Sequence, residues 1–103
     1  MSGGHFNKLT PSQAERLALL IEECGEVIQA ASKVLRHGYE SVNPALTNSP
    51  TNRQSLEKEL GQLMFAADLI VEHDLSPAAV AKAAKAKRES IRQWLHHNRG
   101  NVP

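Results

Sequence analysis

Apolar residues recur at intervals of three and four along three segments, and this pattern restricts the chain to helical architectures. The segments cover residues 10–38, 52–74 and 76–100. Such spacing gathers apolar side chains on one face of an α-helix, whereas a half-buried strand would alternate apolar and polar residues. The sequence therefore predicts an all-α fold with three principal helices and no sheet.

Signals for helix starts and stops flank each segment. Thr10 and Gln13 form a capping-box pattern around Pro11, and Gly38 suits a helix end. The later segments carry similar signals: Thr51 or Asn52 before the second, Ser76 and Pro77 before the third, and Gly100 after the third. We expect residues 10–100 to form a single domain, preceded by a flexible arm over residues 1–9.

The predicted core is aliphatic, because hydrophobic residues make up 41% of the sequence and aromatic residues only 4%. Low aromatic content is typical of helical bundles. We expect the first helix to bury a stripe centred on Cys24, the second a stripe centred on Met64, and the third a stripe that includes Val80 and Trp94.

The sequence also bears on where the protein resides. Cys24 is the single cysteine, the first ten residues contain no apolar signal region, and no apolar run reaches the roughly 20 residues of a membrane span. We therefore expect a soluble, cytoplasmic protein without a membrane partner.

The stretch EECGE places three carboxylates on one face of the first helix. At 100° per residue, Glu23, Glu26 and Glu22 lie at about −100°, −160° and 160° from Cys24. Leu19 and Ala30 fall on the same face, so we expect another part of the structure to cover it. The simpler alternative is a solvated helix face, which is where glutamates of helices usually lie.

The stretch ELGQL gives the second helix a matching polar notch formed by Glu59 and Gln62, with the small Ala66 beside it. If the two helices pack antiparallel, these groups converge with those of EECGE. Converging buried carboxylates require a cation. Hard oxygen ligands favour Mg²⁺, with Mn²⁺ as the alternative ion.

The C-terminal part of the chain is basic. Residues 77–103 have a charge balance of +5, whereas the preceding residues have a balance of −4. Lys87 falls on the apolar stripe of the third helix, where it either extends to the surface or reaches towards phosphates at the acidic site. Lys85 and Arg88 are further phosphate-binding candidates.

These residues resemble a known family. EECGE and ELGQL are similar to the paired motifs of the MazG-like, all-α nucleoside triphosphate pyrophosphohydrolases, which carry Glu-Glu-x-x-Glu on one helix and Glu-x-x-Asp on the next. The likeness covers most of the chain, from about Leu17 to about Arg92. Members of this family use Mg²⁺ to cleave nucleotides between the α- and β-phosphates, and many remove surplus or non-standard nucleotides.

The resemblance implies roles for individual residues. Glu23, Glu26 and Glu59 correspond to metal ligands, and Gln62 replaces the family's aspartate with a neutral amide. Glu22 corresponds to a further ligand or to the group that orients the attacking water, so that Glu22 and Glu23 are the catalytic candidates. Lys85, Lys87 and Arg88 match the family's basic segment and are expected to bind phosphate.

The expected function is Mg²⁺-dependent hydrolysis of a nucleoside triphosphate to the monophosphate and pyrophosphate, by a homodimer or tetramer whose helices form a bundle. One alternative is a non-catalytic nucleotide-binding or regulatory relative. Another is a nucleic-acid-binding module that uses basic residues of the third helix: Lys82, Lys85, Arg88 and Arg92. Nucleic acid is the less favoured partner because the acidic body would repel phosphate backbones.

Overall fold

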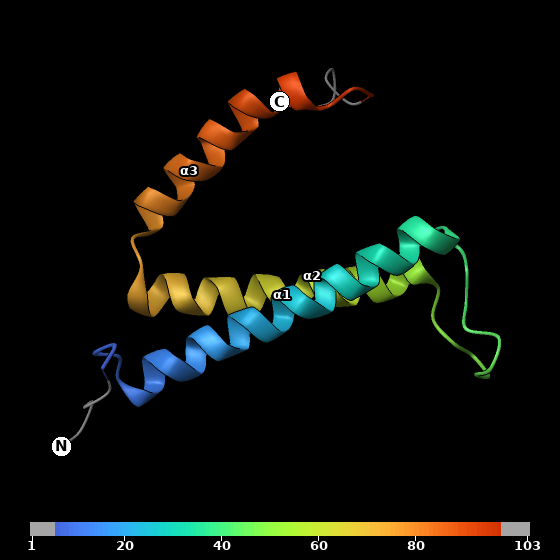
Figure 1. Ribbon diagram of the computed structural model, residues 1–103, viewed down its shortest axis with the longest axis horizontal. Coiled ribbons are helices and arrows are strands. Elements are labelled where there is room, and N and C mark those ends of the chain that lie inside the picture. The colour runs from blue at the N-terminus through green and yellow to red at the C-terminus, as the bar shows by residue number, and fades with distance from the viewer. Residues whose placement is uncertain (1–5, 98–103) are drawn as a thin grey trace. The chain divides into compact units, whose positions relative to one another are not determined.

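The computed structural model describes residues 6–97 and is entirely helical (Figure 1). Helix α1 spans Pro11–His37, α2 spans Asn52–Asp74 and α3 spans Pro77–Ser90, after which the 3₁₀-helix η1 covers Ile91–Trp94. No strand occurs within the described range. The predicted all-α class with three principal helices is confirmed.

Helix α1 begins and ends where the sequence predicts. The Thr10 hydroxyl accepts a hydrogen bond from the Gln13 backbone N–H at 3.2 Å, and the Gln13 side chain accepts one from the Thr10 N–H at 2.9 Å. At the other end, Gly38 has a φ of 89° and donates its N–H to the Val34 carbonyl at 2.7 Å. A positive φ of this kind favours glycine, which explains the stop.

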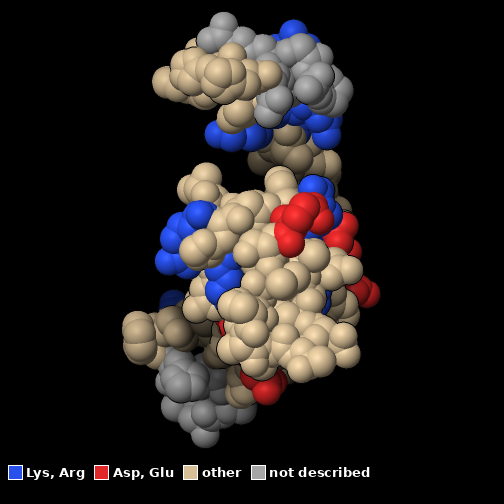
Figure 2. Space-filling view, turned by 90° about the vertical axis from the view of Figure 1, so that its right-hand side faces the viewer, with Lys and Arg blue, Asp and Glu red and all other residues tan. Residues whose placement is uncertain are grey.

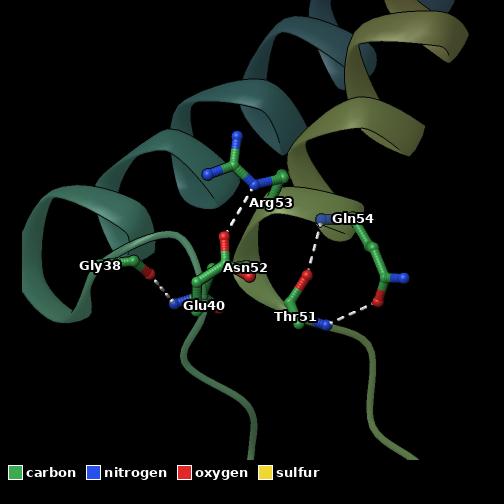
Figure 3. Close-up of polar contacts among 6 residues, drawn as sticks. All are labelled: Gly38, Glu40, Thr51, Asn52, Arg53 and Gln54. Atoms are coloured by element: carbon green, nitrogen blue, oxygen red, sulfur yellow. Dashed lines mark hydrogen bonds and ion pairs between the residues drawn. The ribbon is translucent and has the colours of Figure 1, made fainter.

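The next two helices also begin with side-chain caps. Thr51 and Gln54 exchange two hydrogen bonds, at 3.1 Å to the Thr51 hydroxyl and 2.9 Å to the Gln54 side chain (Figure 3). Thr51, rather than Asn52, is therefore the cap of α2. The Ser76 hydroxyl accepts a hydrogen bond from the Ala79 N–H at 3.1 Å at the start of α3.

Helix α3 is shorter than the sequence predicts. It ends at Ser90, whose hydroxyl donates a hydrogen bond to the Lys87 carbonyl at 3.2 Å, and the chain continues as the tighter turn η1. A serine that bonds to the backbone of the preceding turn competes with the α-helical ladder. The predicted end at Gly100 lies outside the described residues.

The chain divides after Ile70 into two compact units. The first contains α1 and most of α2, and the second contains the end of α2 together with α3 and η1. Most of the predicted arm over residues 1–9 lies outside the described range. The assignment of residues 10–100 to one domain stays a prediction.

Within the first unit, α1 and α2 form an antiparallel hairpin, and Asn52 closes its loop end (Figures 1 and 3). The Asn52 side-chain amide donates to the carbonyls of Lys33 at 3.4 Å and Gly38 at 3.1 Å, while its backbone N–H donates to the Ser41 carbonyl at 2.9 Å. These bonds connect the start of α2 to carbonyls at the end of α1 and in the loop that follows it. They also fix how α2 pairs with α1.

The hairpin core consists of small and aliphatic residues. Ala30 and Ala66 are 7% and 1% exposed, and Ile70 is also buried. Small side chains let two helices approach closely. Larger side chains then fit only at the edges of the interface between the helices. The half-buried aliphatic residues of the packed faces are Leu19, Leu20, Val27 and Val34 on α1 and Leu56, Leu63 and Ala67 on α2.

The centres of the predicted stripes were wrong for both helices of the hairpin. Ile21, Ile28 and Met64 are 71%, 65% and 65% exposed, and Cys24 is exposed as well. The packed faces are rotated by about 90° on α1 and about 120° on α2 from the predicted centres. Two helices can cover only one face of each other, and the alanines select the face that packs.

The predicted burial of the third helix is also not found. Every residue of α3 is exposed, including Val80, and Trp94 of η1 is 68% exposed. Ile91 and Leu95 are half-buried. Since α3 consists mainly of alanine and lysine, it has few large apolar side chains with which to form a core.

Candidate functional site

Two glutamates lie on the packed faces of the hairpin. Glu23 of α1 and Glu59 of α2 are half-buried, and the Glu59 side chain is only 14% exposed. Both occupy the stripes that hold Ala30 and Ala66. Helix α2 therefore covers the acidic face of the first helix at Glu23, whereas Glu22 and Glu26 are exposed, as the alternative of a solvated helix face predicts.

Each of these glutamates has a buried oxygen without a partner. The Oε2 atoms of Glu23 and Glu59 are shielded from solvent and accept no hydrogen bond. The nearest cation to Glu59 is Lys58, whose Nζ lies 3.7 Å from the other oxygen, Oε1, on a side chain that is mostly exposed. Such a pair contributes little, and an unsatisfied buried carboxylate oxygen is costly. The two Oε2 atoms are thus unsatisfied acceptors for a cation or a donor.

The remaining acidic-site candidates lie at the edge of the same interface. Glu22, Glu26 and Gln62 are exposed. Measured from the middle of each packed face, Glu26 lies about 70° around α1 and Gln62 about 80° around α2, in the same rotational sense. Because the helices run in opposite directions, equal rotation in one sense brings both residues to the same side of the hairpin. Glu22 lies further round on that side.

The hairpin closure also sets the level of these residues along the helix axes. Asn52 bonds to residues 33 and 38, and the two antiparallel helices rise by the same distance per residue. Counting from Asn52 along α2 and from these residues back along α1 places Glu59 roughly level with residues 26–31. The same counting places Gln62 roughly level with residues 23–28. The candidates on the two helices therefore occupy the same length of the hairpin. We refer to Glu23, Glu26, Glu59 and Gln62 as the acidic site.

The acidic site offers oxygen donors only, from three carboxylates and one amide. Among residues 6–97, no group of three or more His, Cys, Asp or Glu side chains is arranged to hold an ion. An all-protein cage, as for structural zinc, needs such a group. Mg²⁺ instead takes one or two carboxylates and completes its shell with waters and substrate phosphates. The two unsatisfied oxygens are donors of the chemical type that Mg²⁺ prefers.

The basic candidates belong to the second unit. Lys85, Lys87 and Arg88 lie on α3 and are exposed, so Lys87 does not occupy an apolar stripe that is buried within the chain. Their assignment to phosphate binding stays a prediction.

A pocket of about 490 Å³ lies at the loop end of the hairpin; a ligand pocket lined by this loop is expected from the sequence, but beside the start of α1 rather than its end. Three basic side chains from the end of α1, Lys33, Arg36 and His37, line it together with residues of the 41–50 loop and the start of α2. In the space-filling view onto this end, Lys and Arg gather mainly on one side of the central surface and Asp and Glu mainly on the other (Figure 2). The spacing of the three basic residues, on one flank of a helix beside a long loop, was the available sequence signal.

The base of the loop is held by a second cluster. Arg53 Nε lies 2.8 Å from Glu40 Oε1 (Figure 3). The Arg53 guanidinium also lies 4.3 Å from the centre of the Tyr39 ring. The Arg53 N–H also donates to the Tyr39 carbonyl at 2.9 Å. The hydrogen bond to Glu40 raises the pKa of Arg53.

Comparisons with protein-family models, curated proteins and solved structures found no match to this chain. None of the helices within residues 6–97 is long and apolar enough to cross a membrane.

Proposed function

We propose that this chain is a Mg²⁺-dependent nucleoside triphosphate pyrophosphohydrolase of the MazG-like kind. The observation that carries the proposal is the pair of buried, unpartnered oxygens on Glu23 and Glu59. A chain that needed these positions only for packing would carry apolar residues there, because an unsatisfied buried carboxylate lowers stability. Retaining both carboxylates on facing helices is explained if they bind a cation.

Glu23 and Glu59 would hold the ion through their Oε2 atoms. The exposed Glu26 and Gln62 would be the remaining protein ligands, on the same side of the hairpin. Bound Mg²⁺ supplies charge that polarises the phosphate and lowers the pKa of a bound water. Glu22 would orient the attacking water by accepting a hydrogen bond from it. The water would then bond to the α-phosphorus and release a proton to solvent, while the bond from that phosphorus to the bridging oxygen breaks, which gives the nucleoside monophosphate and pyrophosphate.

We propose that the chain assembles as a homodimer or a tetramer. Leu17, Ile21, Ile28 and Leu35 form an exposed apolar stripe on α1, and Leu60 and Met64 form another on α2. Both stripes lie about 110–120° from the packed faces, in the rotational sense opposite to that of Glu26 and Gln62. They therefore share the side of the hairpin away from the acidic site. A second copy would cover this apolar face as a four-helix bundle and leave the acidic site open.

The test is pyrophosphate release from a panel of nucleoside triphosphates, with Mg²⁺ and with a chelator, in the parent protein, Glu23→Gln and Glu59→Gln. We expect Mg²⁺-dependent release by the parent and a loss of Mg²⁺ affinity of about tenfold or more in either variant, equivalent to about 1.4 kcal/mol, measured by calorimetry. Glu15→Gln, which removes an exposed carboxylate of the same helix, serves as the control and should behave like the parent. Unchanged Mg²⁺ affinity in both site variants would rule out the metal site.

A second candidate function is a nucleotide-binding protein without hydrolytic activity. The feature that favours it is Gln62, which contributes a neutral amide where the resemblance calls for an aspartate. One fewer negative charge weakens the hold on a divalent ion. Mg²⁺-dependent nucleotide binding without pyrophosphate release from any member of the panel would support this alternative.

A further inference from the structure

The pocket at the loop end of the hairpin has an unbalanced charge. Lys33, Arg36 and His37 line one wall, and none of the pocket-lining residues is acidic. Part of this charge is expected at the end of a helix, where cations interact favourably with the terminal carbonyls. Here the Lys33 and Val34 carbonyls already accept hydrogen bonds from Asn52 and Gly38. Within the described residues, the side chains of Lys33, Arg36 and His37 form no hydrogen bond or ion pair with another group, so they are available to a ligand.

The opposite wall supplies hydroxyl groups and apolar surface. Ser41 and Ser55 are half-buried and line the pocket, as do Val42, Pro44 and Leu46 of the loop. The backbone N–H groups at the start of α2 do not contribute, because those of residues 52–55 all donate to carbonyls or to Thr51. At the start of α2, the groups available to an anion are therefore side chains. A volume of about 490 Å³ is that of a small-molecule site rather than a site for a single ion.

The pocket lies beside the acidic site. Ser55 and Glu59 are one helical turn apart, about 6 Å along the axis, and Lys33 follows Glu26 by about 10 Å on α1. Lys33 and Ser55 lie about 90° and 60° from the packed faces, in the same rotational sense as Glu26 and Gln62. Acidic and basic groups thus follow one another along one side of the hairpin.

We infer that this pocket binds the phosphate groups of a nucleoside phosphate, through Lys33 and Arg36 and with the Ser41 and Ser55 hydroxyls as further donors. Cationic side chains and hydroxyls are the donors that phosphate oxygens accept from most strongly, and the loop's apolar residues would contact the uncharged part of the ligand. The identification of the bound group as the pyrophosphate half of a triphosphate rests on the proposed function. The affinity of the pocket for phosphate groups does not rest on the proposed function.

The test uses the full chain in the presence of a chelator, so that no metal contributes. Inorganic pyrophosphate, a nucleoside triphosphate and the matching unphosphorylated nucleoside are titrated by calorimetry. We expect the first two to bind and the nucleoside alone to bind far more weakly or not at all. Lys33→Gln and Arg36→Gln should each weaken pyrophosphate binding, and the double variant should weaken it by about tenfold or more. Lys82→Gln removes the same charge from exposed α3 and should leave binding unchanged.

Circular dichroism checks that the variants are folded, which is expected for the Lys and Arg variants because those side chains are exposed. Absence of pyrophosphate binding by the parent would overturn the inference. An equal loss of pyrophosphate affinity in Lys82→Gln would also overturn it, because it would indicate general attraction to positive charge. A loss of affinity in Lys85→Gln and Arg88→Gln, with none in the pocket variants, would overturn it as well. Metal-free pyrophosphate binding that survives Glu59→Gln, without any hydrolysis by the parent, would uphold the pocket and refute the enzyme.

Discussion

At the scale of single residues, Glu59 and Gln62 occupy one turn of α2 in different environments. The Glu59 carboxylate is largely buried with an unpartnered oxygen, whereas the Gln62 amide is exposed at the edge of the interface. A charge interaction is screened less in a partly desolvated site than in water. The negative charge that Gln62 lacks would therefore act most strongly on an ion held by Glu59 and Glu23.

Restoring that charge with Gln62→Asp should tighten Mg²⁺ binding and raise the rate of pyrophosphate release by about tenfold or more, equivalent to about 1.4 kcal/mol of barrier. The measurements are Mg²⁺ calorimetry and steady-state kinetics. Gln62→Asn, which shortens the side chain equally but stays neutral, is the matched control. If Gln62→Asp instead slows an efficient parent, the amide has a positive role, such as donating a hydrogen bond that holds a neighbouring carboxylate.

At the scale of the helices, both halves of the hairpin contain an interior glycine that packing does not require. A Cβ added to Gly25 or Gly61 would meet no atom within 4 Å, and neither residue has a positive φ. Both point away from the partner helix. Glycine inside a helix lowers stability by about 0.5–1 kcal/mol relative to alanine.

Gly25→Ala and Gly61→Ala should therefore each stabilise an isolated chain by about 0.5–1 kcal/mol, measured by urea unfolding. Gly38→Ala is the contrasting control: it lies in equally open space but at a φ of 89°, so it should destabilise the protein. Destabilisation by Gly25→Ala or Gly61→Ala would mean that another backbone approaches the helix at that point, in a second copy of the chain.

The helices illustrate what the sequence determines locally and what it does not. The starts of α1, α2 and α3 could be predicted because a cap depends on residues three positions apart, such as Thr10 and Gln13. The packed faces could not, since each helix of the hairpin has two apolar stripes and the alanine-containing one is less hydrophobic. Carboxylates at the interface were foreseen because Leu19 and Ala30 share their face. The basic pocket depends on how the 38–51 loop folds back, which periodicity does not describe.

At the scale of the whole molecule, the exposed apolar stripes argue for self-association. Ile28 lies on the α1 stripe, and Phe65 is an exposed apolar residue of similar exposure on α2 outside the stripes. We expect the parent to be at least a dimer in analytical ultracentrifugation and Ile28→Lys to be a monomer, because a charge within a buried apolar interface has no partner. Phe65→Lys should remain at least a dimer. A monomeric parent would refute the assembly, and dissociation by Phe65→Lys alone would place the contact elsewhere.

The contacts at the base of the loop make the ligand pocket structurally separate from the acidic site. The two ends of the loop are held together at its base by contacts of Asn52, Arg53 and Glu40. Residues 42–50 therefore form a loop whose ends are fixed by contacts outside it. Surface loops of this kind tolerate replacement while their scaffold persists. Relatives could exchange this segment and acquire a new ligand preference without rebuilding either helix. The acidic site would then be retained in evolution while the residues that line the pocket change.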